Sequence, residues 1–205
     1  MEKPSHQIQQ FQHLHLSWNT LGLHGAKCIL DALASNSTLT SLNMEANNIE
    51  DAGTISIGEV LKLNNTLKHL NLAKNGIGDA GAHSIFEALK SNSGLISLNM
   101  NSNGMGDKSA NSICGSLQYN STLTSLDIGD NQIGDAGAFL ISEALKSNST
   151  LTNLSMEGLI ITYENWLSIT TKTHSNEIGT LLLNSSNSFR LQTKFLAKNS
   201  SSIFP

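Results

Sequence analysis

Apolar residues recur along most of the chain with a period of 28 residues. Positions 1, 4 and 6 of each period are apolar, and this alternation predicts a short strand with one buried face. Positions 11, 19 and 23 are also apolar, with a spacing that predicts an amphipathic helix. A strand and a helix of this size cannot each bury a face alone, so successive periods must stack and share one core.

Six units follow this pattern. They begin at Phe11, Leu39, Leu67, Leu95, Leu123 and Leu151. The third unit, "LKHLNLAKNGIGDAGAHSIFEALKSNSG", and the fifth, "LTSLDIGDNQIGDAGAFLISEALKSNST", are nearly the same. Because the register is kept from unit to unit, the chain is predicted to form a solenoid.

The repeat pattern weakens toward the end of the chain. The sixth unit is degenerate and one residue shorter, and a seventh start is visible in "IGTLLLN", at Ile178, Leu181 and Leu183. We therefore expect an N-terminal extension over residues 1–10 and six repeats over residues 11–177. Residues 178–205 are expected to form a degenerate seventh repeat or a C-terminal cap with a frayed tail.

The pattern L-x-x-L-x-L-x-x-N-x-I resembles the leucine-rich repeat, and the 28-residue period with a full helix resembles its ribonuclease-inhibitor-type subclass. Five units carry an asparagine at position 9, namely Asn19, Asn47, Asn75, Asn103 and Asn131. In this family that asparagine lies in the turn after the strand, so the resemblance implies a ladder of buried amides. It also implies an α/β horseshoe segment with parallel strands on the concave face and helices on the convex face.

Residues 76–81 read "GIGDAG" and match the dinucleotide-binding pattern G-x-G-x-x-G. The equivalent residues of other units read "TLGLHG", "NIEDAG", "GMGDKS" and "QIGDAG", and no acidic ribose ligand follows the next strand. We therefore interpret the glycines as turn residues and expect no cofactor. The aspartate at position 13 is predicted to cap the helix that it precedes, at Asp51, Asp79, Asp107 and Asp135.

The charge balance argues against a nucleic-acid partner, because 12 Lys and Arg residues stand against 16 Asp and Glu residues. No stretch approaches the length of a membrane span, and we expect a cytoplasmic protein. Cys28 and Cys114 form no C-x-x-C pair and are predicted to be core thiols. The spacing of His13, His15 and His69 does not complete a metal site.

Catalytic residues are not predicted either, because no acid, histidine and serine converge in the repeat register. Positions 3, 5 and 7 should face the concave surface, and position 8 should lie at its rim. The predicted protein-binding residues are His15, Trp18, Glu45, Asn71, Lys74, Asn101, Asp127 and Asp130. An aromatic side chain beside an exposed sheet often carries interface energy, although Trp18 could instead shield the core of the first unit.

The leading hypothesis is a non-enzymatic interaction module that binds a protein partner through its concave face and rim. The resemblance implies relatives among the sensor regions of NOD-like receptors. It also implies an alternative, regulation of a small GTPase, because Ran GTPase-activating proteins share this repeat subclass. Neither end carries a convincing capping repeat, so self-association through an open strand edge is a further expectation.

Overall fold

The computed structural model describes residues 11–162 and the short strand at residues 180–182. Seven strands are formed: β1 (His13–His15), β2 (Ser41–Asn43), β3 (His69–Asn71), β4 (Ser97–Asn99), β5 (Ser125–Asp127), β6 (Asn153–Ser155) and β7 (Thr180–Leu182). The helices between them are α1 (Gly22–Ser35), α2 (Glu50–Leu61), α3 (Asp79–Leu89), α4 (Asp107–Leu117) and α5 (Asp135–Leu145).

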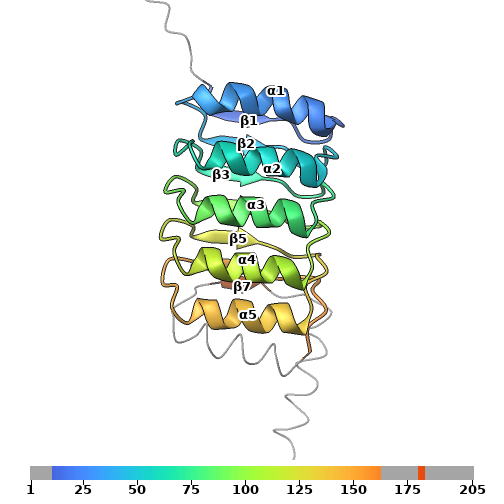
Figure 1. Cartoon of the computed structure of the whole chain (residues 1–205), viewed down its shortest axis with the longest axis vertical. Coiled ribbons are helices and arrows are strands. Elements are labelled where there is room, and N and C mark those ends of the chain that lie inside the picture. Colours follow the sequence, from blue (N-terminus) through green and yellow to red (C-terminus); the bar gives the residue numbers. More distant parts are fainter. Residues whose placement is uncertain (1–10, 163–179, 183–205) are drawn as a thin grey trace, which may run out of the picture.

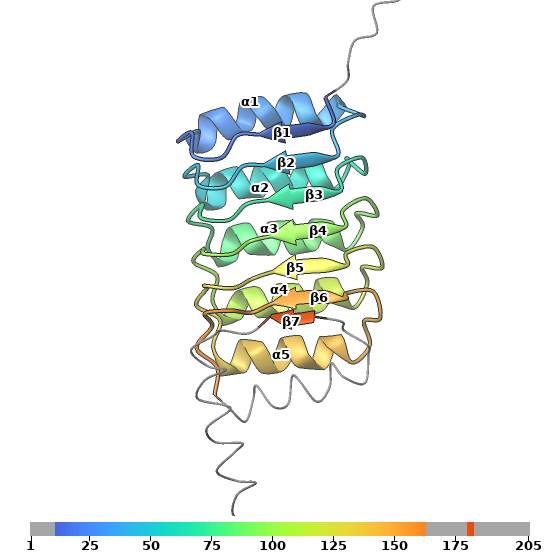
Figure 2. The same ribbon diagram turned by 180° about the vertical axis from the view of Figure 1, so that it is seen from behind.

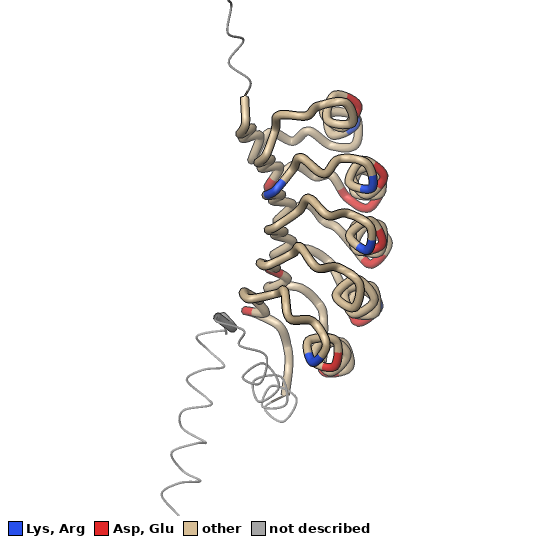
Figure 3. The backbone as a smooth tube through the Cα atoms, turned by 90° about the vertical axis from the view of Figure 1, so that its left-hand side faces the viewer, with Lys and Arg blue, Asp and Glu red and all other residues tan. Residues whose placement is uncertain are grey.

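The strands form one parallel sheet in the order of the sequence, β1 to β7 (Figures 1 and 2). Equivalent positions of adjacent units are paired, so that Leu14 lies opposite Leu42 and Leu42 lies opposite Leu70. Seen from the side, the strands follow the inner side of an arc and the helices follow its outer side (Figure 3). The α/β solenoid predicted from the repeat is therefore confirmed.

The core lies between the sheet and the row of helices. In the third unit, Leu70 and Leu72 point inward from the strand and meet Ile85 and Leu89 of α3, and all four are at most 2% exposed. Burying such a side chain stabilises the fold by about 1.5–3 kcal/mol. Repetition of the same apolar positions makes one continuous core from unit to unit.

The asparagines at position 9 hold successive units together. The Oδ1 atom of Asn75 accepts hydrogen bonds from the backbone N–H of Asn47 at 2.9 Å and of Ile49 at 3.4 Å. Its Nδ2 atom donates to the carbonyl of Met44 in the second unit and to two carbonyls of its own unit. In the sixth unit, Leu159 takes this place and packs into the core.

A second asparagine ladder joins the units at position 26, where the helix turns into the next strand. Asn92 donates from Nδ2 to the carbonyls of Leu61 at 2.7 Å and Asn64 at 2.9 Å. Its Oδ1 atom accepts from the backbone N–H of Gly94 and Leu95. The equivalent residues are Asn36, Asn64, Asn120 and Asn148. Asn36, Asn92 and Asn148 stand in recurrent "SNS" segments, which the sequence marks only as polar turns.

The prediction that each aspartate at position 13 caps its own helix is wrong. Asp79 is the first residue of α3, and its Oδ1 atom instead accepts from the N–H groups of Gly106 at 2.8 Å and Ser109 at 3.1 Å. Asp51 and Asp107 bond in the same way to the units that follow them. A side chain in the first helical turn projects toward the neighbouring unit, so the carboxylates of Asp51, Asp79 and Asp107 each cap the next helix.

The prediction that both cysteines are core thiols also fails. Cys28 is exposed on α1, and Cys114 is only partly buried on α4. Burial raises the pKa of the Cys114 thiol. Cys28 shares position 18 with Ser56 and Ser84, and none of the three is fully buried.

Candidate protein-binding surface

The strand face consists of the outward side chains at positions 3, 5 and 7 of each unit, together with position 8 at the start of the following turn. Position 4 points into the core, and positions 3 and 5 beside it are partly or fully exposed in each described unit. Charged residues concentrate on the helical side, and few lie along the strands (Figure 3). The strand face is therefore mostly uncharged, and its few ionic or aromatic groups stand out.

Four of the predicted binding residues meet at the rim of the first three units. Trp18 is 69% exposed, and the Nζ atom of Lys74 lies 5.3 Å from the centroid of its ring. The same Nζ atom lies 2.9 Å from Oε1 of Glu45, whose Oε2 atom accepts a hydrogen bond from Asn71 at 3.4 Å. These four residues, called the aromatic cluster below, form one connected surface group.

The aromatic cluster depends on a small residue between its two long side chains. Trp18 and Lys74 occupy position 8 two units apart, so their backbones are separated by about 10 Å. Ala46 occupies position 8 of the intervening unit. Its methyl group is small, so the Lys74 side chain can pass over it and reach the indole ring.

Position 8 has a left-handed backbone in all six described units. The φ angles are 63° for Trp18, 55° for Ala46, 56° for Lys74, 54° for Ser102, 48° for Asp130 and 75° for Gly158. This conformation costs most residues other than glycine about 1–2 kcal/mol. A tryptophan or a lysine at this position thus brings strain without burying its side chain in the core. Folding alone would favour glycine or asparagine there.

Position 5 has a structural role that sequence reasoning missed. The Oδ1 atoms of Asn71 and Asp127 accept hydrogen bonds from the backbone N–H two residues later, at Ala73 and Gly129, both at 3.0 Å. Asn43 and Asn99 make the same bond. This is an Asx turn that ends the strand. The recurrence of Asn or Asp at position 5 was the signal that could have revealed it.

Asn101 and Asp130 also lie together, on the fourth and fifth units. The Nδ2 atom of Asn101 and the Oγ atom of Ser102 both approach Oδ2 of Asp130 at 3.5 Å. Asp127 lies on the adjacent strand end, whereas His15 stands apart on β1, the first strand of the sheet. The structure thus brings the predicted residues into two groups, one at each end of the strand face.

The second group lies beside a third carboxylate, Glu157 of the sixth unit. The strand face or its rim thus carries Asp127, Asp130 and Glu157, and the backbone N–H of Asp130 donates to the carbonyl of Glu157 at 2.6 Å. Within residues 11–162 none of the three carboxylates forms an ion pair, unlike Glu45, which is paired with Lys74. These three residues are called the acidic end below.

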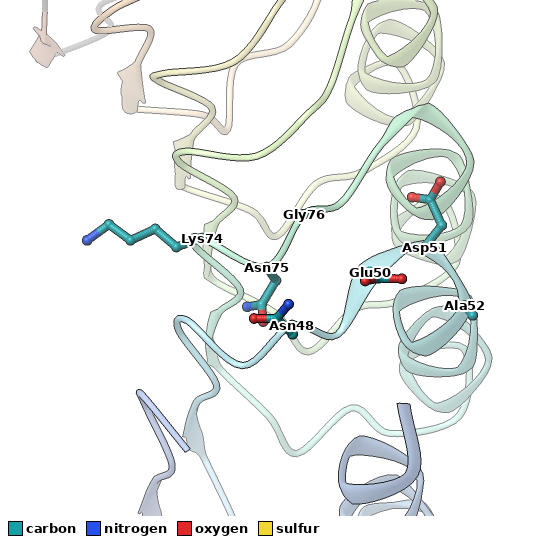
Figure 4. Close-up of a pocket in the computed structure, with 7 residues that line it drawn as sticks. All are labelled: Asn48, Glu50, Asp51, Ala52, Lys74, Asn75 and Gly76. Atoms are coloured by element: carbon teal, nitrogen blue, oxygen red, sulfur yellow. The ribbon is translucent and has the colours of Figure 1, made fainter. Parts of the chain in front are cut away.

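A pocket of about 480 Å³ lies beside the turns of the second and third units (Figure 4). It is lined by Asn48, Glu50, Asp51, Ala52, Lys74, Asn75 and Gly76. Lys74 extends away from the other labelled side chains (Figure 4). The Oδ1 atom of Asp51 is held by the N–H groups of Gly78 and Gly81, and Asn75 belongs to the asparagine ladder. Two polar side chains of this pocket, Asp51 and Asn75, thus serve the stacking of units.

Among the described residues, no group of three or more His, Cys, Asp or Glu side chains is placed to hold a metal ion. No helix within the described part of the chain is long and apolar enough to cross a membrane. The strand face offers an aromatic ring, one ion pair, imidazoles, hydroxyls, amides and carboxylates, which are groups that can recognise another surface.

Comparisons with known proteins agree with the repeat architecture. Five segments, residues 9–30, 35–58, 63–86, 91–114 and 119–142, match the family model described as Leucine Rich repeat and together span more than half of the chain. A solved structure titled leiomodin-1 actin-binding site 2 has 25% sequence identity and a TM-score of 0.64, covering 82% of this chain and 95% of that chain.

A Caenorhabditis elegans tropomodulin C-terminal domain has 15% identity and a TM-score of 0.60, covering 84% of this chain and 98% of its own. Its identity is low enough that it shows the fold alone. A comparison with curated proteins finds no match. Since the family model accounts for five consecutive units of the array described above, the chain belongs to the leucine-rich repeat family.

Proposed function

We propose that this chain is a non-enzymatic protein-binding module that holds its partner on the strand face and the position-8 rim. Membership of the leucine-rich repeat family supports an interaction role, and the aromatic cluster supports this particular surface. Exposed tryptophans in a rigid setting are the residues that most often carry binding energy between proteins.

The observation that carries the proposal is the position of Trp18. Its ring is 69% exposed and its backbone is left-handed, so its side chain adds little to the core while its backbone is strained. The left-handed backbone is shared by position 8 of every described unit, so the large exposed ring, and not the strain, distinguishes Trp18. The ion pair between Lys74 and Glu45 holds the cation over the ring, and a pre-organised group loses less entropy when a partner docks.

Actin is the first partner to test, because the leiomodin structure that resembles this chain is titled as an actin-binding site. The purified chain would be mixed with monomeric actin and with actin filaments, and binding measured by calorimetry and co-sedimentation. Trp18→Ala should weaken binding by at least about tenfold, as for an interface hot spot. The matched control is Leu63→Ala, which removes an exposed apolar side chain, 76% exposed, outside the strand face.

The same pair of variants tests the binding surface with any other partner. Equal loss of binding in both variants, or none in Trp18→Ala, would place the partner surface elsewhere.

Regulation of a small GTPase stays a prediction from the resemblance to Ran GTPase-activating proteins. Single-turnover GTP hydrolysis by a panel of Ras-like GTPases tests it, and unchanged rates would remove it. The ribonuclease-inhibitor-type subclass, the cytoplasmic location and self-association through the chain ends also stay predictions.

A further inference from the structure

We infer that the partner contributes a segment with an apolar side chain that packs on Trp18 and a group of arginines or lysines that meets the acidic end. This inference rests on the proposed function and adds the chemistry of the partner. It depends on two features at opposite ends of the strand face, the aromatic cluster and the carboxylates of Asp127, Asp130 and Glu157.

The aromatic cluster selects for an apolar group. Lys74 already supplies a cation to the indole ring, 5.3 Å from its centroid, and Glu45 neutralises that cation at 2.9 Å. A second cation would be repelled by the charge of Lys74. An aliphatic or aromatic side chain can instead cover the rest of Trp18, which is 69% exposed. Burial of that area is the favourable term at this end.

The acidic end selects for cations. Its three carboxylates have no lysine or arginine partner within the described part of the chain, and they lie on two adjacent units, Asp127 and Asp130 on the fifth and Glu157 on the sixth. An arriving guanidinium or ammonium group can therefore pair with a carboxylate that no lysine or arginine of the described residues neutralises. Arginine suits this role because its planar donors match carboxylates in pairs.

The two ends are separated by a fixed length. Trp18 and Asp130 occupy position 8 of the first and fifth units, so four strand spacings place them about 19 Å apart. An extended segment covers this length with about six residues and a helix with about thirteen. Of the residues between the ends, Ala73 at position 7 is small and buried, whereas Lys74 and Asn101 carry longer side chains that a bound segment must pass beside.

Labelled synthetic peptides test the inference with the full chain. One peptide carries a leucine and a group of arginines about six residues apart, and the other replaces the arginines with glutamates. Fluorescence anisotropy should show at least about tenfold tighter binding of the arginine peptide, with a preference that falls as salt is raised. Two helical peptides, with about thirteen residues between the leucine and the arginines or glutamates, are tested in the same way.

The neutral variant Asp127→Asn, Asp130→Asn, Glu157→Gln should lose the preference for arginine while keeping its fold. Asn is the residue at position 5 of three other units and can keep the Asx turn of Asp127. Trp18→Ala should weaken the arginine peptide without changing how its binding depends on salt. Circular dichroism and thermal melting would confirm that both variants are folded.

Equal affinities for the arginine and glutamate peptides would overturn the inference, as would an unchanged preference in the neutral variant. Absence of binding by all arginine peptides up to about 1 mM, an affinity near 4 kcal/mol, would also overturn it. The proposed function would survive any of these results if Trp18→Ala still abolished capture of a protein partner while Leu63→Ala did not.

Discussion

At the scale of single residues, position 8 has a backbone conformation that favours glycine, but most units carry a larger side chain there. Every described unit has a left-handed backbone at this point, yet only the sixth has a glycine there. Ala46 shows the cost most simply, because its methyl group forms no hydrogen bond and its φ angle is 55°. Larger residues at the same position, such as Trp18 and Lys74, have the same strain and gain contacts only on the surface.

Ala46→Gly should therefore stabilise the chain by up to about 1 kcal/mol, because glycine adopts a left-handed backbone without strain. The same substitution in α2, Ala52→Gly, should destabilise by about 1 kcal/mol, because it adds backbone entropy to the unfolded chain and lowers helix propensity. Urea unfolding followed by circular dichroism measures both. If the two changes had the same sign, the strain assigned to position 8 would be wrong.

Asn75→Ala should have a much larger effect, about 3 kcal/mol or more of lost stability. Its side chain is 1% exposed and serves five backbone groups, so its removal leaves buried donors and acceptors without partners. Asn111→Ala, on the exposed side of α4, is the control and should change stability by less than about 0.5 kcal/mol. Similar values for the two variants would contradict the role of the ladder.

At the scale of elements, α3, α4 and α5 each depend on the unit before them for a cap. Asp79 shows this dependence in its ionisation. Burial opposes the charged form, but the Ser109 hydroxyl and the N–H groups of Gly106 and Ser109 together outweigh it and lower the pKa of the Asp79 carboxyl. A lowered pKa in the folded state means that ionised Asp79, at the start of α3, stabilises the start of α4.

The sign of the pH dependence follows. The contribution of Asp79 is fully present above the unfolded pKa, near 3.8, and is lost as the pH falls through the lower folded value. Asp79→Asn should thus cost about 1–2 kcal/mol at pH 7 and less at pH 3, where the carboxyl is partly protonated. Asp31→Asn, an exposed residue of α1, is the control. A loss for Asp79→Asn that is equal at both pH values would contradict this account.

The sequence predicts the units, the strand positions and the core, because apolar periodicity reports directly which side chains are buried. It does not predict the direction of the aspartate caps, since a carboxylate at a helix start can reach either its own helix or the next, and only the spacing of units decides. Nor does it reveal the contact of Lys74 with Trp18, which depends on the small side chain of Ala46 between them. The left-handed backbone at position 8 could not be predicted either, because tryptophan, lysine and alanine are not residues that usually adopt it.

At the scale of the whole molecule, stability is approximately a sum over units and the interfaces between neighbours, so one weak unit limits the array. We expect the fourth unit to be the weak one, because α4 buries three serines, Ser109, Ser112 and Ser116. The first bonds to Asp79 and the second lies 3.0 Å from a ring nitrogen of His83. Ser116 is 1% exposed, and its Oγ atom finds no hydrogen-bond partner among the described residues.

Ser116→Ala should stabilise the chain by about 1–2 kcal/mol, because it removes a buried hydroxyl without a partner and leaves no large cavity. Alanine already occupies the equivalent position in three other units, at Ala32, Ala88 and Ala144. Hydrogen exchange measured by mass spectrometry should show α4 opening more readily than α3 in the parent chain and becoming slower in the variant. Ser142→Ala is the control, because its Oγ atom donates to the carbonyl of Phe139 at 2.7 Å and its loss should not stabilise. If Ser116→Ala left exchange in α4 unchanged, the weakness of the fourth unit would lie in its interfaces with its neighbours and not in its buried hydroxyl.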